Sequence, residues 1–204
     1  MYSFLGKIGI MGGTFNPIHI AHISMAEAAY RQAGLDKVVF MPSKNPPHKQ
    51  DISIIPEKHR KAMIKLAISG IPYFEYSDFE FEREGITYSA NTLEILCKMH
   101  PENKYYFIMG GDSFFQIENW YMPEKIMEFT TLLVINRNGS NKEQLLVHSR
   151  SLKEKYNAKV MFVDMPRMDI SSSGIRKLIS SGGNATRYLP LKVAEYIKDN
   201  KCYM

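Results

Sequence analysis

Two histidines three residues apart, His19 and His22, stand where a helix-patterned stretch begins. The segment Gly12–His22 reads GGTFNPIHIAH and directly follows the short apolar run Ile8–Met11. Paired glycines allow a sharp turn and a close approach of the backbone to a ligand, and a helix N-terminus adds free N–H groups with a positive partial charge. Imidazoles at positions i and i+3 project from one helix face. The spacing therefore favours a polyphosphate site, with two alternatives: a capped helix that buries one imidazole, or a zinc-binding pair.

A second anion-accepting helix start is predicted near the C-terminus. Asp169–Lys177 reads DISSSGIRK and follows the apolar run Val160–Val163. Serine hydroxyls cap helix N-termini, and a guanidinium in the first turns can bind phosphate oxygens through two N–H groups. We expect Arg176 to serve in this way. A plain serine-capped surface helix is the alternative.

Three further groups with chemical potential lie in the middle of the chain. The segment after Val38–Met41 reads PSKNPPHK, a stiff loop that could bring Lys44 to a phosphate or simply form a rigid surface turn. Asp112 follows a glycine pair at the end of another apolar run, where a carboxylate can reach a ribose hydroxyl. Trp120 is the only tryptophan of the chain, and it would serve either as a stacking platform or as a core aromatic.

Short apolar runs that alternate with helix-patterned stretches must position these groups. Continuous rather than alternating apolar runs are typical of strands covered on both faces, and alternation with helices indicates a parallel sheet. The predicted strands are 8–11, 38–41, 105–109, 132–135 and 160–163, and the predicted helices are 20–33, 57–68, 91–99, 143–156, 174–179 and 191–199. Gly34 suits a left-handed helix cap. Tyr73–Glu82 alternates aromatic and polar residues, which predicts an extended piece near the sheet edge.

We therefore expect one α/β domain over residues 1–204, with a doubly wound, mainly parallel sheet in residues 1–165 and a helical C-terminal part in residues 166–204. Ligands of such sheets bind beyond the carboxyl ends of the strands, where the winding direction reverses. All the groups above follow predicted strands, so we expect them to gather at that edge.

Composition and charge exclude several classes of protein. With 45% hydrophobic residues in 204, the chain can bury a core without disulfides, so disorder is excluded as its main state. The net charge of +5 is spread along the chain in blocks no longer than Arg60–Lys61 or Arg176–Lys177, which indicates a solvated surface and no nucleic-acid partner. Two distant cysteines, no signal-peptide pattern and no long apolar run predict a cytoplasmic protein without a membrane partner.

The two end motifs carry a family resemblance. Gly12–His22 resembles the G-G-T-F-D-P-x-H-x-G-H signature of the nucleotidyltransferase superfamily, and Ile170–Arg176 resembles its I-S-S-T-x-I-R motif. Asn16 stands where Asp is usual, Ala21 where Gly is usual, and Ser173 keeps the hydroxyl of the usual Thr. We expect these departures to alter affinity rather than to abolish activity.

The middle of the chain is similar to the bacterial nicotinate-nucleotide adenylyltransferase family. That family combines P-x-x-x-P-P-H-K, R-x-G-x-x-Y-x-x-D-T-L and G-x-D-x-x-x-x-x-x-x-W, and this chain matches all three except that Asn91 replaces an Asp. The resemblance implies a Rossmann-like nucleotidyltransferase that makes nicotinate adenine dinucleotide and pyrophosphate from ATP and nicotinate mononucleotide for NAD biosynthesis. Mg²⁺ would come with the ATP and need no side-chain ligand. A homo-oligomer is left open.

The resemblance also implies roles for individual residues. The expected catalytic groups are His19, His22, Lys44 and Arg176. The expected ATP-binding residues are Gly12, Gly13, Thr14, Phe15, His19, His22, Ile170, Ser171, Ser172, Ser173 and Arg176. The expected residues for the mononucleotide are Lys44, Thr87, Tyr88, Asp112, Trp120 and Tyr121, with Trp120 stacked on the pyridine ring and backbone groups near Thr87 and Tyr121 receiving its carboxylate.

Two other functions remain as alternatives. Phosphopantetheine adenylyltransferase shares both end motifs, but it is a shorter chain without the Trp120 and Pro46–Lys49 segments. A nucleotide- or RNA-binding module without chemistry is the alternative from another class. The lack of basic clusters and of an aromatic RNA-binding signature argues against this module.

Overall fold

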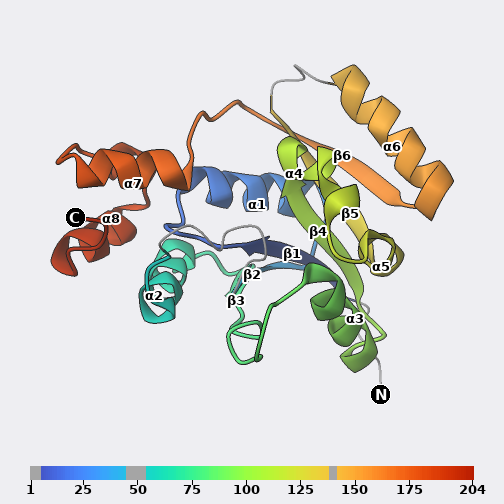
Figure 1. Cartoon of the computed structure of the whole chain (residues 1–204), viewed down its shortest axis with the longest axis horizontal. Coiled ribbons are helices and arrows are strands. Elements are labelled where there is room, and N and C mark those ends of the chain that lie inside the picture. The colour runs from blue at the N-terminus through green and yellow to red at the C-terminus, as the bar shows by residue number, and fades with distance from the viewer. Residues whose placement is uncertain (1–5, 45–53, 138–141) are drawn as a thin grey trace.

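A six-stranded, all-parallel sheet forms the centre of the molecule in the computed structural model, which describes residues 6–44, 54–137 and 142–204 (Figure 1). The strand order is β3-β2-β1-β4-β5-β6, so the chain winds one way from β1 to β3 and the other way from β4 to β6. This is the doubly wound topology expected from the sequence. The strands are β1 (Lys7–Gly13), β2 (Lys37–Pro42), β3 (Phe74–Tyr76), β4 (Lys104–Gly110), β5 (Thr130–Arg137) and β6 (Lys159–Met165).

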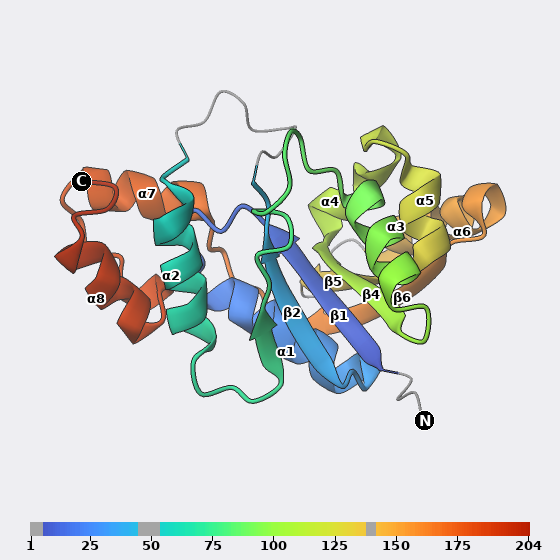
Figure 2. The same ribbon diagram turned by 90° about the horizontal axis from the view of Figure 1, so that it is seen from below.

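Helices cover both faces of the sheet. They are α1 (Ile20–Ala33), α2 (Glu57–Ile68), α3 (Ser89–Met99), α4 (Gly111–Phe115), α5 (Pro123–Phe129), α6 (Lys142–Tyr156), α7 (Ser172–Ser180) and α8 (Leu191–Asp199), with short 3-10 turns η1 (Ile117–Asn119) and η2 (Thr186–Tyr188). Viewed from below, α2, α7 and α8 gather at one end of the molecule and α3, α5 and α6 at the other (Figure 2).

Alternate side chains of the strands belong to two separate hydrophobic cores. On β5, Leu133 and Ile135 join the core under α1, α2, α7 and α8, whereas Leu132 and Val134 join the core under α3 to α6. Side chains of a strand point to opposite faces in turn, so an all-apolar strand is buried on both sides. The C-terminal helices share the first of these cores through Ile175, Val193 and Ile197.

Most elements confirm the sequence prediction, and the differences lie in short segments. The predicted helix ends of α1, α2 and α8 agree with the structure, and Gly34 caps α1 with φ 58°. The extended piece predicted over Tyr73–Glu82 is wrong beyond Tyr76, because only β3 pairs with β2, at the sheet edge, and the chain then turns. The helical turns α4, η1 and α5 were not predicted, since helices of three to seven residues show no helical period.

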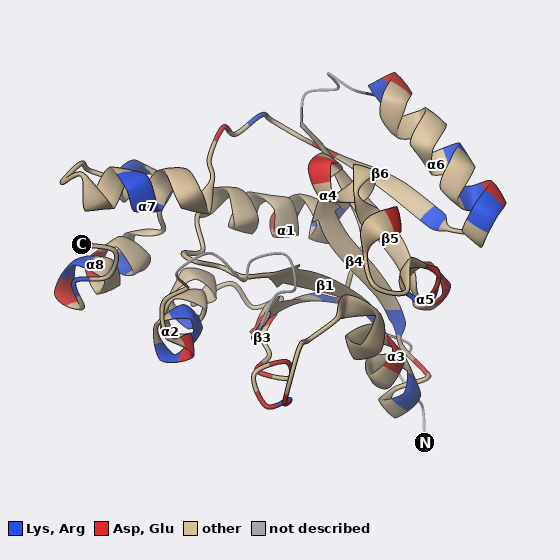
Figure 3. Cartoon of the chain, viewed as in Figure 1, with Lys and Arg blue, Asp and Glu red and all other residues tan. Residues whose placement is uncertain are grey.

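Basic and acidic residues occur together on several helices of the described chain. Lysines and arginines occur beside acidic residues on α2, α6 and α8 (Figure 3). Within the described residues, no helix combines the length and apolar character needed to cross a membrane.

A partly exposed ion-pair network ties α3 to α5. The ammonium groups of Lys125 and Lys98 lie 2.6 and 2.7 Å from the carboxylate of Glu94 and hold its pKa at about 2. A carboxyl whose pKa is lower in the folded than in the unfolded state stabilises the fold above its unfolded value, and this stabilisation is lost as the pH falls through its folded value. Glu94→Gln should therefore lower the melting temperature at pH 7, and the difference from the parent should close between pH 4.5 and about 2. Thermal melts across this range test it, with Glu143→Gln on α6 as an exposed control; a gap independent of pH would contradict it.

Candidate active site

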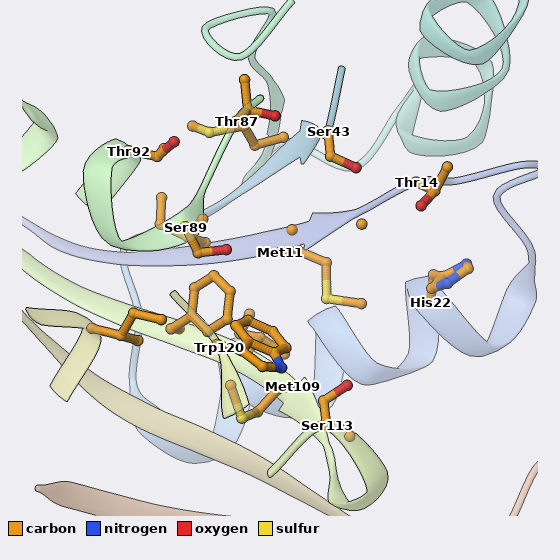
Figure 4. A pocket seen from close by; sticks show the side chains of 18 of the residues that line it. Met11, Thr14, His22, Ser43, Thr87, Ser89, Thr92, Met109, Ser113 and Trp120 are labelled. Carbon is orange, nitrogen blue, oxygen red and sulfur yellow. The ribbon is translucent and has the colours of Figure 1, made fainter. Parts of the chain in front are cut away.

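A cavity of about 790 Å³ opens at the carboxyl ends of β1 and β4. These neighbouring strands are the point where the winding direction reverses, so the cavity lies where a doubly wound sheet is expected to bind its ligand. Residues 10–13 of β1 and 107–110 of β4 form its base. Thr14 and His22 lie at one end, and Trp120 and Ser89 lie toward the other (Figure 4).

The first loop, defined here as residues 14–19 between β1 and α1, turns at Phe15 rather than at the glycines. Gly12 and Gly13 continue the strand and line the cavity, while the positive φ of 48° falls on Phe15, followed by a cis Asn16–Pro17 bond. The sharp turn predicted at the glycine pair is therefore wrong by two residues. A Cβ at Gly13 would lie 3.2 Å from the buried ring of Phe15, so a larger residue there would crowd that ring.

His19 and His22 form a stacked pair at the start of α1. Their ring centroids are 3.7 Å apart, and the backbone N–H of His19 donates to Nδ1 of His22 at 3.2 Å. Because Nδ1 accepts this bond, the proton of a neutral His22 ring sits on Nε2, which makes Nε2 a hydrogen-bond donor. Both histidines line the cavity, and the ring of Phe15 supports His22 edge-on at 5.1 Å. The structure thus brings the two predicted histidines together where they line the cavity.

The second motif docks onto the first loop. Ser171 caps α7 by accepting from the N–H of Gly174 at 3.1 Å, and Ile170 and Ser171 line the cavity. Ser172 donates its hydroxyl to the carbonyl of Pro17 at 2.9 Å, and Arg176 donates to the carbonyl of Asn16 at 2.8 Å. Ser172, Ser173 and Arg176 are not among the residues that line the cavity. The hydrogen bond of Arg176 instead holds the first loop.

Aromatic side chains line the far end of the cavity. Trp120 packs edge-on against Phe107 of β4 with ring centroids 6.1 Å apart, and it is half-buried. Tyr88 and Tyr121 stack on each other at 4.2 Å. These three aromatic residues line the cavity together with Thr87 and Asp112. The structure therefore brings together the mononucleotide-binding residues expected from the sequence, Lys44 excepted.

Lys44 lies outside the cavity lining and makes other contacts. Its ammonium donates to the carbonyls of Phe81 and Arg83 at 2.9 and 3.0 Å. These bonds tie the end of β2 to the segment that leads to Thr87, so the structure gives Lys44 a bracing position and does not support the expected phosphate contact. The neighbouring predicted loop residues Asn45 to Lys49 lie outside the described part of the chain.

A buried carboxyl lines the same cavity and was not anticipated. Glu80 is 7% exposed and accepts from the hydroxyl of Thr92 at 2.8 Å, and Thr92 in turn accepts from Arg83 at 3.0 Å. Burial raises the pKa of Glu80. Thr87 and Thr92 stand on the wall of the cavity above Trp120 (Figure 4).

Comparisons with known proteins agree with this geometry. The cytidylyltransferase-like family model matches residues 10–178. A nicotinate-nucleotide adenylyltransferase of Lachnoclostridium phytofermentans is 44% identical over 198 residues, which cover 97% of this chain and 99% of that relative. The chain belongs to the nicotinate-nucleotide adenylyltransferase family. The relative of the same name in Carboxydothermus hydrogenoformans is 39% identical to this chain, and the match covers 98% of that relative.

Solved structures share the fold of this nicotinate-nucleotide adenylyltransferase family member. Two structures of the Plasmodium falciparum nicotinic acid mononucleotide adenylyltransferase, complexed with NaAD and with APC, match with TM-scores of 0.81 and 0.79. Each match covers 97% of this chain and 97% of the other chain. The sequence identity is 22% for the complex with NaAD and 21% for the complex with APC. The family identifies the chain as a nucleotidyltransferase, so the site described above is that of an enzyme.

Some site residues of this family member escaped the sequence analysis. Glu80 carries no motif of its own, and the turn after β3 brings it to the cavity. Thr92 lies in the R-x-G-x-x-Y-x-x-D-T-L segment, which gave no role to its hydroxyl. Arg60 was counted among solvated charges, but it is 1% exposed and lies behind the first loop. The predicted absence of a side-chain metal site stays a prediction, although the described residues contain no cluster of three or more His, Cys, Asp or Glu able to hold a metal.

Proposed function

We propose that this chain transfers the adenylyl group of ATP to nicotinate mononucleotide, with release of pyrophosphate. One observation carries the proposal: a single cavity at the switch point of the sheet has a histidine pair at a helix N-terminus at one end and a tryptophan face at the other. The first end suits phosphates and the second suits an aromatic base.

The two substrates divide the cavity between them in this proposal. The triphosphate of ATP lies against His19, His22 and the start of α1, with the adenosine toward Ile170 and Ser171. The pyridine ring of the mononucleotide lies on Trp120, near Thr87, Tyr88 and Tyr121. Asp112 stands at the start of α4, where its carboxylate can accept from a ribose hydroxyl.

The reaction requires alignment and charge stabilisation rather than a general base. A phosphate monoester has a second pKa of about 6, so the nucleophile is already mostly dianionic at neutral pH. Its oxygen attacks the α-phosphorus of ATP, the P–O bond to the β-phosphate breaks, and pyrophosphate leaves with that electron pair. The Nε2–H of His22 can donate to the oxygens on which charge develops in the transition state.

Mg²⁺ enters the proposal as a companion of ATP. The donors at the phosphate end of the cavity are imidazoles and backbone N–H groups, which suit phosphate oxygens and are poor ligands for a hard cation. A Mg²⁺ ion bound to the triphosphate would neutralise part of its charge. His19 and His22 would then contact phosphate oxygens that the metal leaves free.

A side-by-side turnover assay tests the function. Pyrophosphate release is measured with ATP and Mg²⁺ plus nicotinate mononucleotide, nicotinamide mononucleotide or phosphopantetheine, and each assay is repeated with excess EDTA. We expect the highest kcat/KM with nicotinate mononucleotide and a requirement for Mg²⁺. Preference for phosphopantetheine would replace the proposed substrate, and binding of nucleotides without any pyrophosphate release would favour a binding module.

A further inference from the structure

Arg60 of α2 is a buried cation that the proposed mechanism does not use. Its side chain is 1% exposed, and its guanidinium lies 4.8 Å over the ring of Phe81. Among the ion pairs formed by the described residues none involves Arg60. Desolvation by burial lowers its pKa, which means that the surroundings disfavour its charge. A charge kept in such a position stabilises the fold poorly and calls for another explanation.

The hydrogen bonds of Arg60 point to the phosphate end of the cavity. Its NH1 group donates to the carbonyl of Thr14 at 3.1 Å and to the carbonyl of Ser43 at 2.6 Å. Thr14 and Ser43 both line the cavity, from the first loop and from the residue that follows β2 (Figure 4). The guanidinium therefore lies one residue behind the cavity wall.

Arg60 is part of a wider pattern in the first loop. The carbonyl of Thr14 accepts from Arg60, that of Asn16 from Arg176, and that of Pro17 from Ser172. A carbonyl oxygen carries partial negative charge and would repel an anion if it faced the cavity. Three carbonyls of the loop are instead held by side chains of α2 and α7, two of them by guanidinium groups.

We propose that Arg60 is a positioning residue for the triphosphate of ATP, which caps the Thr14 and Ser43 carbonyls and places a fixed positive charge behind the first loop. The identity of the anion rests on the proposed function. The charge acts through a poorly solvated layer, where its attraction for phosphates is screened less than at the surface. Arg60 acts through the loop and through its field, without touching the nucleotide.

The test varies the charge of the ligand rather than its shape. ATP, ADP, AMP and adenosine are titrated calorimetrically in the absence of Mg²⁺ into the parent, Arg60→Met and Arg60→Lys. We expect Arg60→Met to raise the Kd of ATP by about tenfold, the effect of one partly screened charge. The loss should shrink through ADP and AMP and vanish for adenosine. Arg60→Lys should lie between the parent and Arg60→Met, because it keeps the charge without the forked geometry.

Lys61→Met is the matched control. It removes the same charge from the next residue of α2, where the side chain is 41% exposed and paired with Asp78 at 2.8 Å. If Lys61→Met lost as much ATP affinity as Arg60→Met, Arg60 would contribute only through the net charge of the protein, and the proposal would be overturned. Equal losses for all four ligands would overturn it as well, because they would mean that the loop has simply collapsed.

Two further measurements keep the outcome decisive. Melting temperatures are recorded for every variant. If Arg60→Met does not fold, Arg60→Gln takes its place, because the glutamine amide can still donate to one carbonyl. Turnover of the parent with nicotinate mononucleotide is measured separately. A parent that binds the nucleotide series but does not adenylylate the mononucleotide contradicts the proposed function and leaves the role of Arg60 intact.

Discussion

Replacing His22 by alanine should lower the turnover number by about 10²- to 10³-fold, the range found when one transition-state donor is lost. The backbone N–H of His19 fixes the ring of His22 from Nδ1, and Phe15 supports it edge-on, so its Nε2–H is aimed before substrate arrives. A preorganised donor of this kind costs no reorganisation during the reaction. Steady-state pyrophosphate release with saturating ATP and nicotinate mononucleotide measures the effect.

His100→Ala is the control for this experiment. His100 follows α3, its side chain is 52% exposed, and it pairs with Glu102 at 3.5 Å, away from the cavity lining. We expect its turnover to match the parent. A His22→Ala enzyme with undiminished turnover would exclude the donor role and leave His22 as a capping residue of α1.

Replacing Trp120 by alanine should raise the KM for nicotinate mononucleotide by about 5- to 150-fold, as expected for the loss of one base–aromatic stack. The KM for ATP should change little, because the histidine pair and the first loop lie at the other end of the cavity (Figure 4). Initial rates with one substrate varied at a time separate the two constants.

Two measurements distinguish stacking of Trp120 on the substrate from a packing role in the core: the KM values of Trp120→Phe, and the comparison of the KM values for both substrates. Phenylalanine retains an aromatic face next to Phe107, so its KM for the mononucleotide should lie between those of the parent and Trp120→Ala. If Trp120→Ala raised both KM values equally, Trp120 would be a core residue whose loss disturbs the whole cavity.

Local patterns in the sequence predicted the features that depend on residues close together in the chain. The spacing of His19 and His22, the serine cap of α7 and the buried strands depend on neighbours within a few residues, and the structure confirms all three. The position of Lys44 depends on carbonyls 37 and 39 residues away, which no local pattern encodes. Its expected phosphate contact therefore rested on the stiffness of the loop and on the family resemblance.

The sequence of α2 contains a signal that Arg60 is buried. The buried residues of α2 include Met63, Ile64, Ala67 and Ile68, and Arg60 precedes them at helical spacing on the same face. An arginine in register with an apolar stripe is expected to be buried, whereas its place next to Lys61 suggested a solvated pair. Charge counting along the chain misses this distinction, because exposure follows the helix face rather than the neighbouring residue.

The contacts that shape the first loop join residues far apart in the chain. Ser172 and Arg176 reach it across 155 and 160 residues, and the hydroxyl of Tyr203 donates to the side chain of Asn16 across 187 residues at 2.9 Å. Contacts of such high sequence separation require the closure of a long loop, which costs conformational entropy and slows folding. The individual helices depend on local contacts, but the phosphate end of the cavity takes its shape only when residues from both extremes of the described chain have met. During refolding, catalytic competence should thus be the last property that the molecule regains.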